Sequence, residues 1–201
     1  MTKNKGKTNY IYDKTNMTKN RCAWCEKDDL YRDYHDNEWG KPVYEDESLF
    51  EFLILETFQA GLSWYTILAK RENFRKALDH FDYKKIAKYN DSKVEELLQN
   101  AGIIRNKLKV KATISNAIAF MEIQKEFGSF SKYIWNFVDG KPIDNKPKTL
   151  QEVPATTPLS DAISKDLKKR GFKFVGSTVM YAHMQATGMV NDHVEACFTR
   201  K

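Results

Sequence analysis

Apolar residues recur at helical spacing along almost the whole chain after Arg21. The clearest stripe contains Val110, Ile114, Ala117 and Met121, at positions i, i+4, i+7 and i+11. This spacing places the side chains on one face of an amphipathic helix. No segment shows a convincing strand pattern, in which apolar and polar residues alternate. The sequence therefore predicts an all-α fold.

Caps, stripes and glycine stops divide the chain into predicted helices. We expect a nearly all-apolar, central helix from Ser48 to about Phe58, before Gly61. Further helices are expected over Ser63–Leu78, Asp91–Ala101, a long segment beyond Asn106, Phe130–Phe137, Ser160–Lys169 and Phe174–Thr187. The stretch from Asp139 to Leu159 holds four of the five prolines and is predicted to be a loop.

The 201 residues suit one domain, or two lobes that share a core, because single cores rarely exceed roughly 200–250 residues. Hydrophobic residues make up 41% of the chain, which excludes a disordered protein. The apolar runs are too short to cross a bilayer, and the polar first 20 residues do not resemble a secretory signal. We therefore expect a cytoplasmic protein with no membrane partner, and a monomer by default.

The net charge of +6 is concentrated at the amino terminus. Residues 1–20 carry five lysines against one aspartate, which leaves 28 basic and 26 acidic residues in the remainder. The tetrapeptide Met-Thr-Lys-Asn occurs at residues 1–4 and again at 17–20. We expect residues 1–20 to be a flexible basic extension and residues 21–201 to be the helical domain. Nucleic-acid binding would then depend on local patches.

Soft metal donors stand at both ends of the domain. Cys22 and Cys25 form a C-x-x-C pair, and His193 and Cys197 would lie one helical turn apart. Thiolates and imidazoles suit tetrahedral zinc. The sequence leaves two ligand sets open, one with Cys25 and one with His35 in its place. Alternatively, the cysteines only fill gaps in the core.

Glu56 falls on an apolar stripe of its predicted helix, between Phe52 and Ala60. A buried, unpaired carboxylate is costly unless it is hydrogen-bonded or protonated. It is therefore either one partner of a buried salt bridge or a group that reads a ligand. Aromatic residues that could form a core or stack on a planar ligand lie near it in the sequence: Trp24, Tyr31, Tyr34, Trp39, Trp64 and Tyr65.

A basic turn with two glycines, residues 168–176, joins two predicted helices. Backbone N–H groups at the start of the second helix could bind phosphate, and the lysines would add nonspecific attraction. A second basic cluster contains Arg105, Lys107, Lys109 and Lys111. Each cluster could equally be a solvated surface.

Together these segments resemble the 3-methyladenine DNA glycosylase I family, the constitutive bacterial type within the helix-hairpin-helix glycosylase superfamily. The matching segments span residues 21–197 in order. They are RCAW (21–24), YHDNEWG (34–40), LE (55–56), QAGLSW (59–64), KREN (70–73), AGIIR (101–105), LKKRGFKFVG (167–176) and VNDHV (190–194). The resemblance implies a helix-hairpin-helix glycosylase fold with a zinc site that joins the chain ends.

The resemblance also implies residue roles. One structural zinc would be held by Cys22, His35, His193 and Cys197, so Cys25 would not be a ligand. Glu56 and Tyr34 would read the base, Trp64 and Trp24 would stack on it or wall it, and Trp39 would lie nearby. The DNA-gripping hairpin would be residues 169–176, with Lys169, Arg170, Gly171, Lys173 and Gly176 as its contacts.

The expected activity is that of a monofunctional DNA repair N-glycosylase. It would flip 3-methyladenine out of double-stranded alkylated DNA, hydrolyse its N-glycosyl bond, leave an abasic site and release the free base. Asn191 stands where many relatives carry a catalytic Asp, and Asp192 would face about 100° away on a helix. The family tolerates this loss because a cationic base leaves readily. The alternative is a zinc-stabilised helical DNA-binding module without catalysis.

Overall fold

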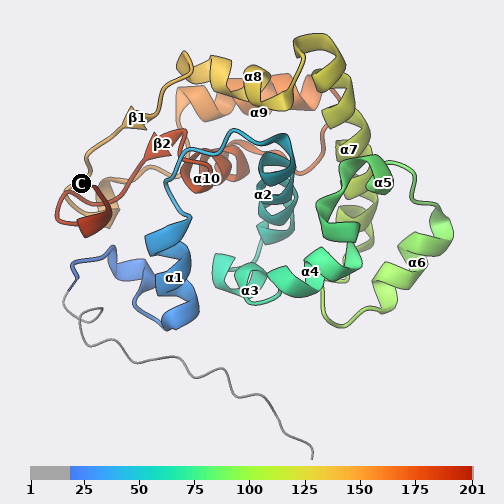
Figure 1. Ribbon diagram of the computed structural model, residues 1–201, viewed down its shortest axis with the longest axis horizontal. Helices are drawn as coiled ribbons and strands as arrows, with labels where there is room; N and C mark the ends of the chain where they lie inside the picture. The colour runs from blue at the N-terminus through green and yellow to red at the C-terminus, as the bar shows by residue number, and fades with distance from the viewer. Residues whose placement is uncertain (1–18, 201) are drawn as a thin grey trace, which may run out of the picture.

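The computed structural model describes residues 19–200, so almost all of the predicted basic extension lies outside the described residues. Helices surround one central helix, α2 (Figure 1). The helical elements are η2 (Ala23–Cys25), α1 (Asp29–Asn37), α2 (Asp46–Gln59), α3 (Trp64–Leu68), α4 (Arg71–Ala77), η3 (Asp79–Phe81), α5 (Tyr83–Ile86), α6 (Asp91–Gln99), α7 (Lys107–Phe127), α8 (Phe130–Trp135), η4 (Asn136–Val138), η5 (Leu150–Glu152), α9 (Pro158–Lys169), α10 (Ser177–Ala186) and η6 (Phe198–Arg200). None of these helices is long and apolar enough to cross a membrane.

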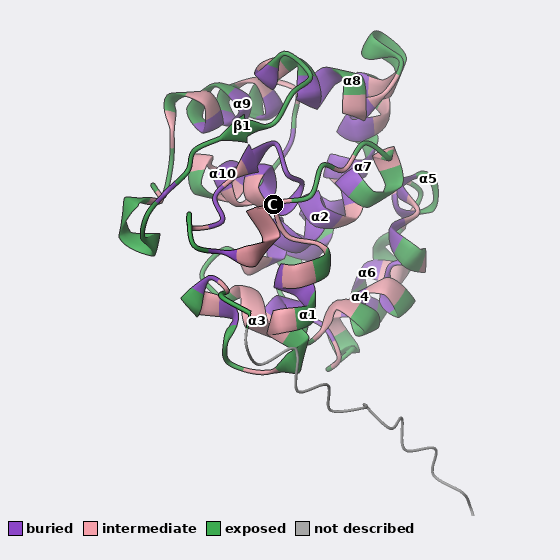
Figure 2. Cartoon of the chain, turned by 60° about the vertical axis from the view of Figure 1, so that its left-hand side comes forward, coloured by how far each residue is buried: buried purple, intermediate pink, exposed green. Residues whose placement is uncertain are grey.

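Helix α2 is buried on nearly every side, as its sequence predicts (Figure 2). It contacts α3, α7, α8 and α10. The helix begins at Asp46, two residues before the predicted Ser48. The Asp46 carboxylate accepts hydrogen bonds from the backbone N–H groups of Phe130 and Ser131, at 2.9 and 2.8 Å, and so caps the start of α8. The central helix is thereby connected to the layer above it in Figure 1.

Three further predicted helices differ in their bounds. The segment Ser63–Leu78 is divided into α3 and α4. Helix α9 begins at Pro158. The Thr157 hydroxyl oxygen accepts a hydrogen bond from the Ser160 N–H, and the Ser160 hydroxyl oxygen accepts one from the Thr157 N–H, which completes a capping box. Helix α10 begins at Ser177, three residues later than predicted, since Phe174 has a left-handed φ of 58°.

The predicted loop between Asp139 and Leu159 contains the short strand β1 (Ile143–Asp144), which pairs in parallel with β2 (Val190–Asn191). Two residues per strand are too few to produce a visible alternation. The pairing holds the loop against the carboxy-terminal segment. The predicted helix through Asp192 and His193–Cys197 is wrong, because the chain there runs from the strand into a turn.

Candidate functional site

Four potential metal ligands from both ends of the chain meet in one buried cluster. Cys22, His35, His193 and Cys197 offer ligand atoms that all lie within 4.8 Å of one another. His193 Nδ1 lies 3.2 Å from His35 Nε2 and 3.7 Å from Cys22 Sγ. Cys197 Sγ lies 3.5 Å from His35 Nε2 and 3.6 Å from His193 Nδ1. These residues can therefore hold one metal ion.

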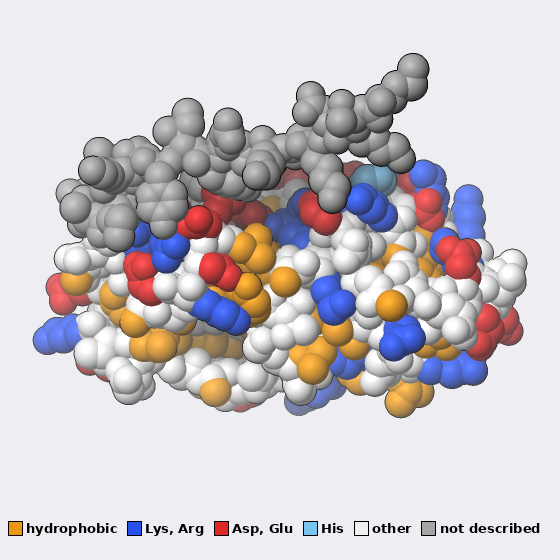
Figure 3. Space-filling view, turned by 90° about the horizontal axis from the view of Figure 1, so that it is seen from below, with side chains coloured by type: hydrophobic (Ala, Val, Ile, Leu, Met, Phe, Trp, Pro, Cys, Tyr) orange, Lys and Arg blue, Asp and Glu red, His pale blue; other side chains and the backbone are white. Residues whose placement is uncertain are grey.

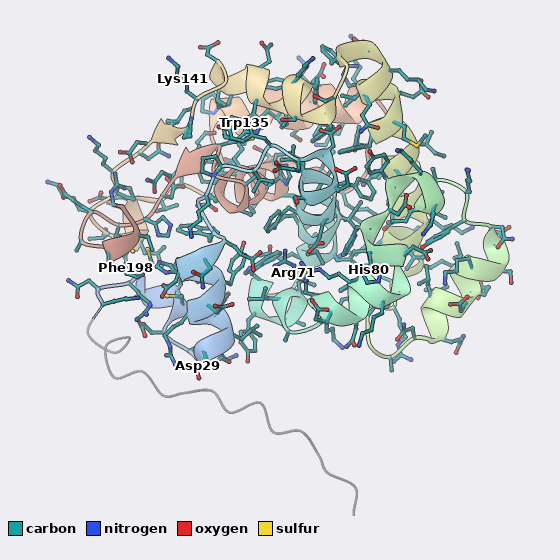
Figure 4. All side chains as sticks on the ribbon, in the orientation of Figure 1. Asp29, Arg71, His80, Trp135, Lys141 and Phe198 are labelled. Carbon is teal, nitrogen blue, oxygen red and sulfur yellow. The ribbon has the colours of Figure 1, made fainter. Side chains whose placement is uncertain are left out.

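Cys25 is not part of this cluster, which decides between the two ligand sets that the sequence left open. Its buried thiol instead donates to the Cys22 carbonyl oxygen at 3.1 Å. His35, and not Cys25, is the fourth member of the cluster. The segments that carry the ligands also meet at Phe198, labelled in Figure 4, whose backbone N–H donates to the Asn20 carbonyl at 2.9 Å.

Outer hydrogen bonds fix the orientation of both imidazoles. His35 Nδ1 lies 2.8 Å from the Asp36 carboxylate, which Arg21 also binds. His193 Nε2 lies 3.0 Å from the Trp39 carbonyl oxygen. The other nitrogen of each ring is therefore left for a metal. Gly40 packs closely against the His193 ring. A Cβ atom at this position would lie only 2.8 Å from His193 Nε2, so a larger residue would push the ring out of place.

A cavity of about 210 Å³ lies beside the metal-ligand cluster. It is lined by Trp24, Tyr31, Tyr34, Trp39, Glu56, Gln59, Trp64, Leu150, Ala182 and Gln185. The predicted set of Tyr34, Glu56 and three tryptophans therefore meets at one site, whereas Tyr65 is not among the lining residues. Trp24 is central to the aromatic wall: its ring centroid lies 5.1 Å from Trp39 and 6.4 Å from Tyr34.

Glu56 is buried in this cavity with no partner. It forms no salt bridge with any residue in the described part of the chain, and its Oε2 atom has no hydrogen bond. Burial raises its pKa to about 8. The salt-bridge interpretation of Glu56 is therefore wrong. Burial, with a smaller contribution from the Glu56 charge, also raises the pKa of Tyr34 well above its usual value.

The turn between α2 and α3 positions Trp64. Gly61 adopts a left-handed φ of 82°, and the Ser63 side chain caps α3. Lys109, placed by sequence analysis in a solvated or DNA-binding cluster, is in fact buried. Its ammonium group donates to the carbonyl oxygens of Phe58 and Ala60, at 2.8 and 2.6 Å. It therefore stabilises the last turn of α2.

Arg71 connects three of the segments around the cavity. It extends from α4 toward α2 (Figure 4), where it pairs with Glu51 and stacks over Phe52. Its Nη1 atom also lies 2.6 Å from Glu38, the neighbour of Trp39. On the face of the molecule seen in Figure 3, basic side chains lie among acidic ones.

The basic turn lies between α9 and α10, as predicted. Gly171 has a φ of 95°, and Asn116 on α7 holds the backbone of Lys173 by two hydrogen bonds, of 2.8 and 3.1 Å. Lys169 and Lys173 are exposed. Arg170 is instead engaged within the protein, since it pairs with Asp166 and Glu126 at 2.7 and 2.6 Å. Gly176 precedes α10 as its N-cap residue.

A family model described as methyladenine glycosylase matches residues 24–200. The chain belongs to this family. Curated methyladenine glycosylases of high similarity include DNA-3-methyladenine glycosylase 1 of Escherichia coli (strain K12), which is 50% identical over 88% of this chain and 95% of its own length. The DNA-3-methyladenine glycosylase of Haemophilus influenzae is 48% identical over 88% of this chain and 96% of its own length.

Solved methyladenine glycosylase structures have the same fold. A crystal structure of 3-methyladenine DNA glycosylase I is 51% identical, with a TM-score of 0.87, and covers 89% of this chain and 98% of its own. The Staphylococcus aureus enzyme, solved to explain its recognition of 3-methyladenine, is 35% identical with a TM-score of 0.88. The match covers 90% of this chain and 97% of that one.

Sequence reasoning did not assign Leu150, Ala182 and Gln185 to the cavity of this methyladenine glycosylase. They come from the proline-rich loop and from α10, which are more than 85 residues beyond Trp64 in the chain. Neither segment carries a local motif for a pocket, so only tertiary packing brings them there. Gln59 belongs to the QAGLSW segment that carries the family resemblance, but nothing in the sequence indicated that its side chain faces the cavity.

Proposed function

We propose that this protein excises 3-methyladenine from alkylated double-stranded DNA as a monofunctional N-glycosylase. The observation that carries the proposal is the buried, unpartnered Glu56 in a cavity walled by tryptophans. An aromatic wall suits a flipped purine, because stacking contributes roughly 1–3 kcal/mol per base. The carboxylate selects a base that is both a hydrogen-bond donor and positively charged.

Alkylation at N3 gives adenine a positive charge, and this charge explains how the pocket can discriminate. A cationic ring gains a cation–π interaction with Trp64 and Trp24 that neutral adenine lacks. Glu56, whose pKa is raised to about 8 by burial, becomes ionised most readily when a cation enters. Tyr34 lies beside Glu56 at the same wall and would contact the base as well.

The same charge reduces what the chemical step requires. The electron pair of the N-glycosyl bond moves to N9 and neutralises the base, so no acid has to protonate it. Water then adds to the deoxyribose C1′ and loses a proton to solvent. The protein contributes by unstacking the nucleotide and excluding unmodified bases. This division of work is compatible with an Asn at position 191.

The α9–α10 turn is the proposed DNA contact. The exposed Lys169 and Lys173 attract phosphates, and the first backbone N–H groups of α10, which follow the N-cap residue Gly176, could bind them. Gly171 gives the turn its left-handed φ. Arg170 would contribute less to phosphate binding than the lysines, because its two ion pairs already balance its charge. One chain carries the pocket and the DNA contact, so we expect a functional monomer.

The metal that the four-residue cluster fits best is zinc. Tetrahedral zinc, at about 2.3 Å from sulfur and 2.0–2.1 Å from nitrogen, separates its ligand atoms by about 3.3–3.8 Å. Four of the six separations between the ligand atoms are 3.2 to 3.7 Å, and all six are within 4.8 Å. When bound, the ion would crosslink Cys22 and His35 to His193 and Cys197, a structural role. It would take no part in hydrolysis.

The test is release of free base from methylated duplex DNA by the purified protein. We expect 3-methyladenine in the soluble fraction and abasic sites in the DNA. A non-catalytic DNA-binding module, the alternative, would bind the same duplex but release nothing. Binding without release would therefore exclude the glycosylase function and favour that alternative.

A further inference from the structure

Asp192 is buried directly behind the cavity and binds three side chains. It accepts hydrogen bonds from the Tyr181 hydroxyl at 2.7 Å, from Gln185 Nε2 at 2.8 Å and from Asn145 Nδ2 at 2.7 Å. Two of these donors lie on α10 and the third follows β1. Asp192 is buried and is not among the residues that line the cavity, and its carboxylate is already occupied by these three donors.

Gln185 is the member of this network that lines the cavity. A carboxylate only accepts hydrogen bonds, so the amide nitrogen of Gln185 must face Asp192. This fixes an orientation that coordinates alone leave ambiguous. The amide oxygen then points away from Asp192, and it has no hydrogen bond to any other side chain or backbone group in residues 19–200. A rigid, free acceptor is left at the wall.

The position of Gln185 places this acceptor near the sugar and not at the base-reading end. Glu56 and Tyr34 are the only lining residues that are buried, so they mark the floor. Gln185 is half-buried and shares the outer wall with Ala182 and the exposed Leu150. A base that enters ring first keeps its deoxyribose at the mouth.

We propose that the Gln185 amide oxygen accepts a hydrogen bond from the water that attacks C1′, and that Asp192 is a positioning residue for this amide. The inference rests on the proposed function. In the step, the C1′–N9 bond breaks with its electron pair on N9, the water oxygen bonds to C1′, and the surplus proton passes to solvent. Gln185 orients the water without removing the proton.

This assignment also explains Asn191, the last residue of β2, and Asp192, which follows it. Asn191, at the position of the missing catalytic Asp, accepts a hydrogen bond from the His193 backbone N–H at 3.2 Å and so shapes the ligand-bearing turn. Asp192 reaches the pocket only through Gln185. The side chain that faces the sugar thus comes from α10, seven residues earlier in the chain.

Single-turnover base release by Gln185→Met tests the proposal. Methionine keeps the length of the side chain but has no strong acceptor, so the rate should fall about tenfold. Affinity for free 3-methyladenine, which has no sugar, should stay within about twofold. A wild-type rate would overturn the proposal. A loss of free-base affinity that matches the loss of rate would also overturn it, because Gln185 would then read the base.

A double-mutant cycle tests the role of Asp192. Asp192→Ala removes the oxygen that accepts from Gln185 Nε2, so the Gln185 amide loses its fixed orientation. The rate should fall by about as much as in Gln185→Met, and the double variant should lose no more. Additive losses would overturn the positioning role. Metal content and melting temperature serve as controls, since Asp192 adjoins His193.

If Asp192→Ala fails to fold, the Gln185→Met comparison still decides whether the amide oxygen acts. The wild-type protein separates the two levels of the argument. Absence of base release by the wild type would overturn the proposed function itself. Normal release by both wild type and Gln185→Met would overturn this inference alone.

Discussion

His193 Nε2 lies 3.0 Å from the backbone carbonyl of Trp39, so a metal-ligand candidate directly supports a wall of the cavity. The other ligands adjoin wall residues as well. Cys22 precedes Trp24 by two positions, and His35 follows Tyr34 on α1. The metal cluster and the pocket are therefore built from the same short segments.

Removal of the metal should consequently damage the pocket together with the fold. We expect a chelator to lower the melting temperature, to change tryptophan fluorescence and to weaken the binding of free 3-methyladenine. Cys22→Ser should do the same, whereas Cys25→Ser, which retains a donor for the Cys22 carbonyl, should be nearly silent. Equal effects of the two substitutions, or zinc-free protein of unchanged stability, would contradict the assignment.

Lys109 should be required for the shape of the α2–α3 turn. Lys109→Met keeps the alkyl stem but leaves the carbonyl oxygens of Phe58 and Ala60 without their donor, at a cost of about 1–3 kcal/mol. Affinity for 3-methyladenine should fall with stability, because this turn carries Trp64. The matched control is Lys107→Met, an exposed lysine paired with Glu95, which should cost under about 0.5 kcal/mol. Indistinguishable melting temperatures would refute the capping role.

The cations of the hairpin should separate into two functional classes. Replacing Lys169 and Lys173 by alanine should weaken binding to any duplex and reduce its salt dependence, because fewer counterions are released. Arg170→Ala should mainly lower stability, since it breaks the pairs with Asp166 and Glu126. Binding measured against salt concentration checks both. The division is wrong if the arginine variant gives the larger reduction in slope.

His183 should make stability depend on pH. It is fully buried in α10, both ring nitrogens lack partners, and burial lowers its pKa to about 3 from 6.5. Below pH 6.5 the unfolded state therefore binds a proton that the folded state excludes. Stability should fall as pH falls, with this residue contributing up to about 1.4 kcal/mol per pH unit.

His183→Leu isolates this contribution, because the other histidines are common to both proteins. The free energy of unfolding of the variant should change less than that of the wild type between pH 6.5 and 5. It should also be higher at neutral pH, as two unsatisfied nitrogens are removed. Denaturant titrations at several pH values measure both effects. Parallel pH profiles would show that His183 is not excluded from protonation.

Helical periodicity was sufficient to predict the all-α fold and the central position of α2, because these depend on local spacing and burial. The start of α9 depends on the reciprocal hydrogen bonds between Thr157 and Ser160, which composition does not reveal. The β1–β2 pair could not be predicted, since two residues per strand carry no period. Only the long-range pairing gives them their structure.

The functional site was predictable where a charge or a donor contradicted its surroundings. Glu56 stood out because a carboxylate on an apolar stripe needs an explanation. The candidate metal donors stood out by residue type, which left Cys25 and His35 as alternatives until the structure brought His35 into the cluster. Gln185 and Lys109 carry no such signal. An amide on an amphipathic helix and a lysine among lysines look like surface groups until their partners are known.

The affinity of free 3-methyladenine for the wild type and for Glu56→Gln, measured by calorimetry, tests the central claim most directly. At a pH above the pKa of about 8, the wild-type carboxylate is ionised and accepts hydrogen bonds from the exocyclic amine of the base. In Glu56→Gln, an NH2 donor replaces one of the two acceptor oxygens, so one of these hydrogen bonds cannot form. We predict an intact fold and an affinity lower by about 1–3 kcal/mol. Equal affinities would contradict the assignment of Glu56 as the base-reading residue.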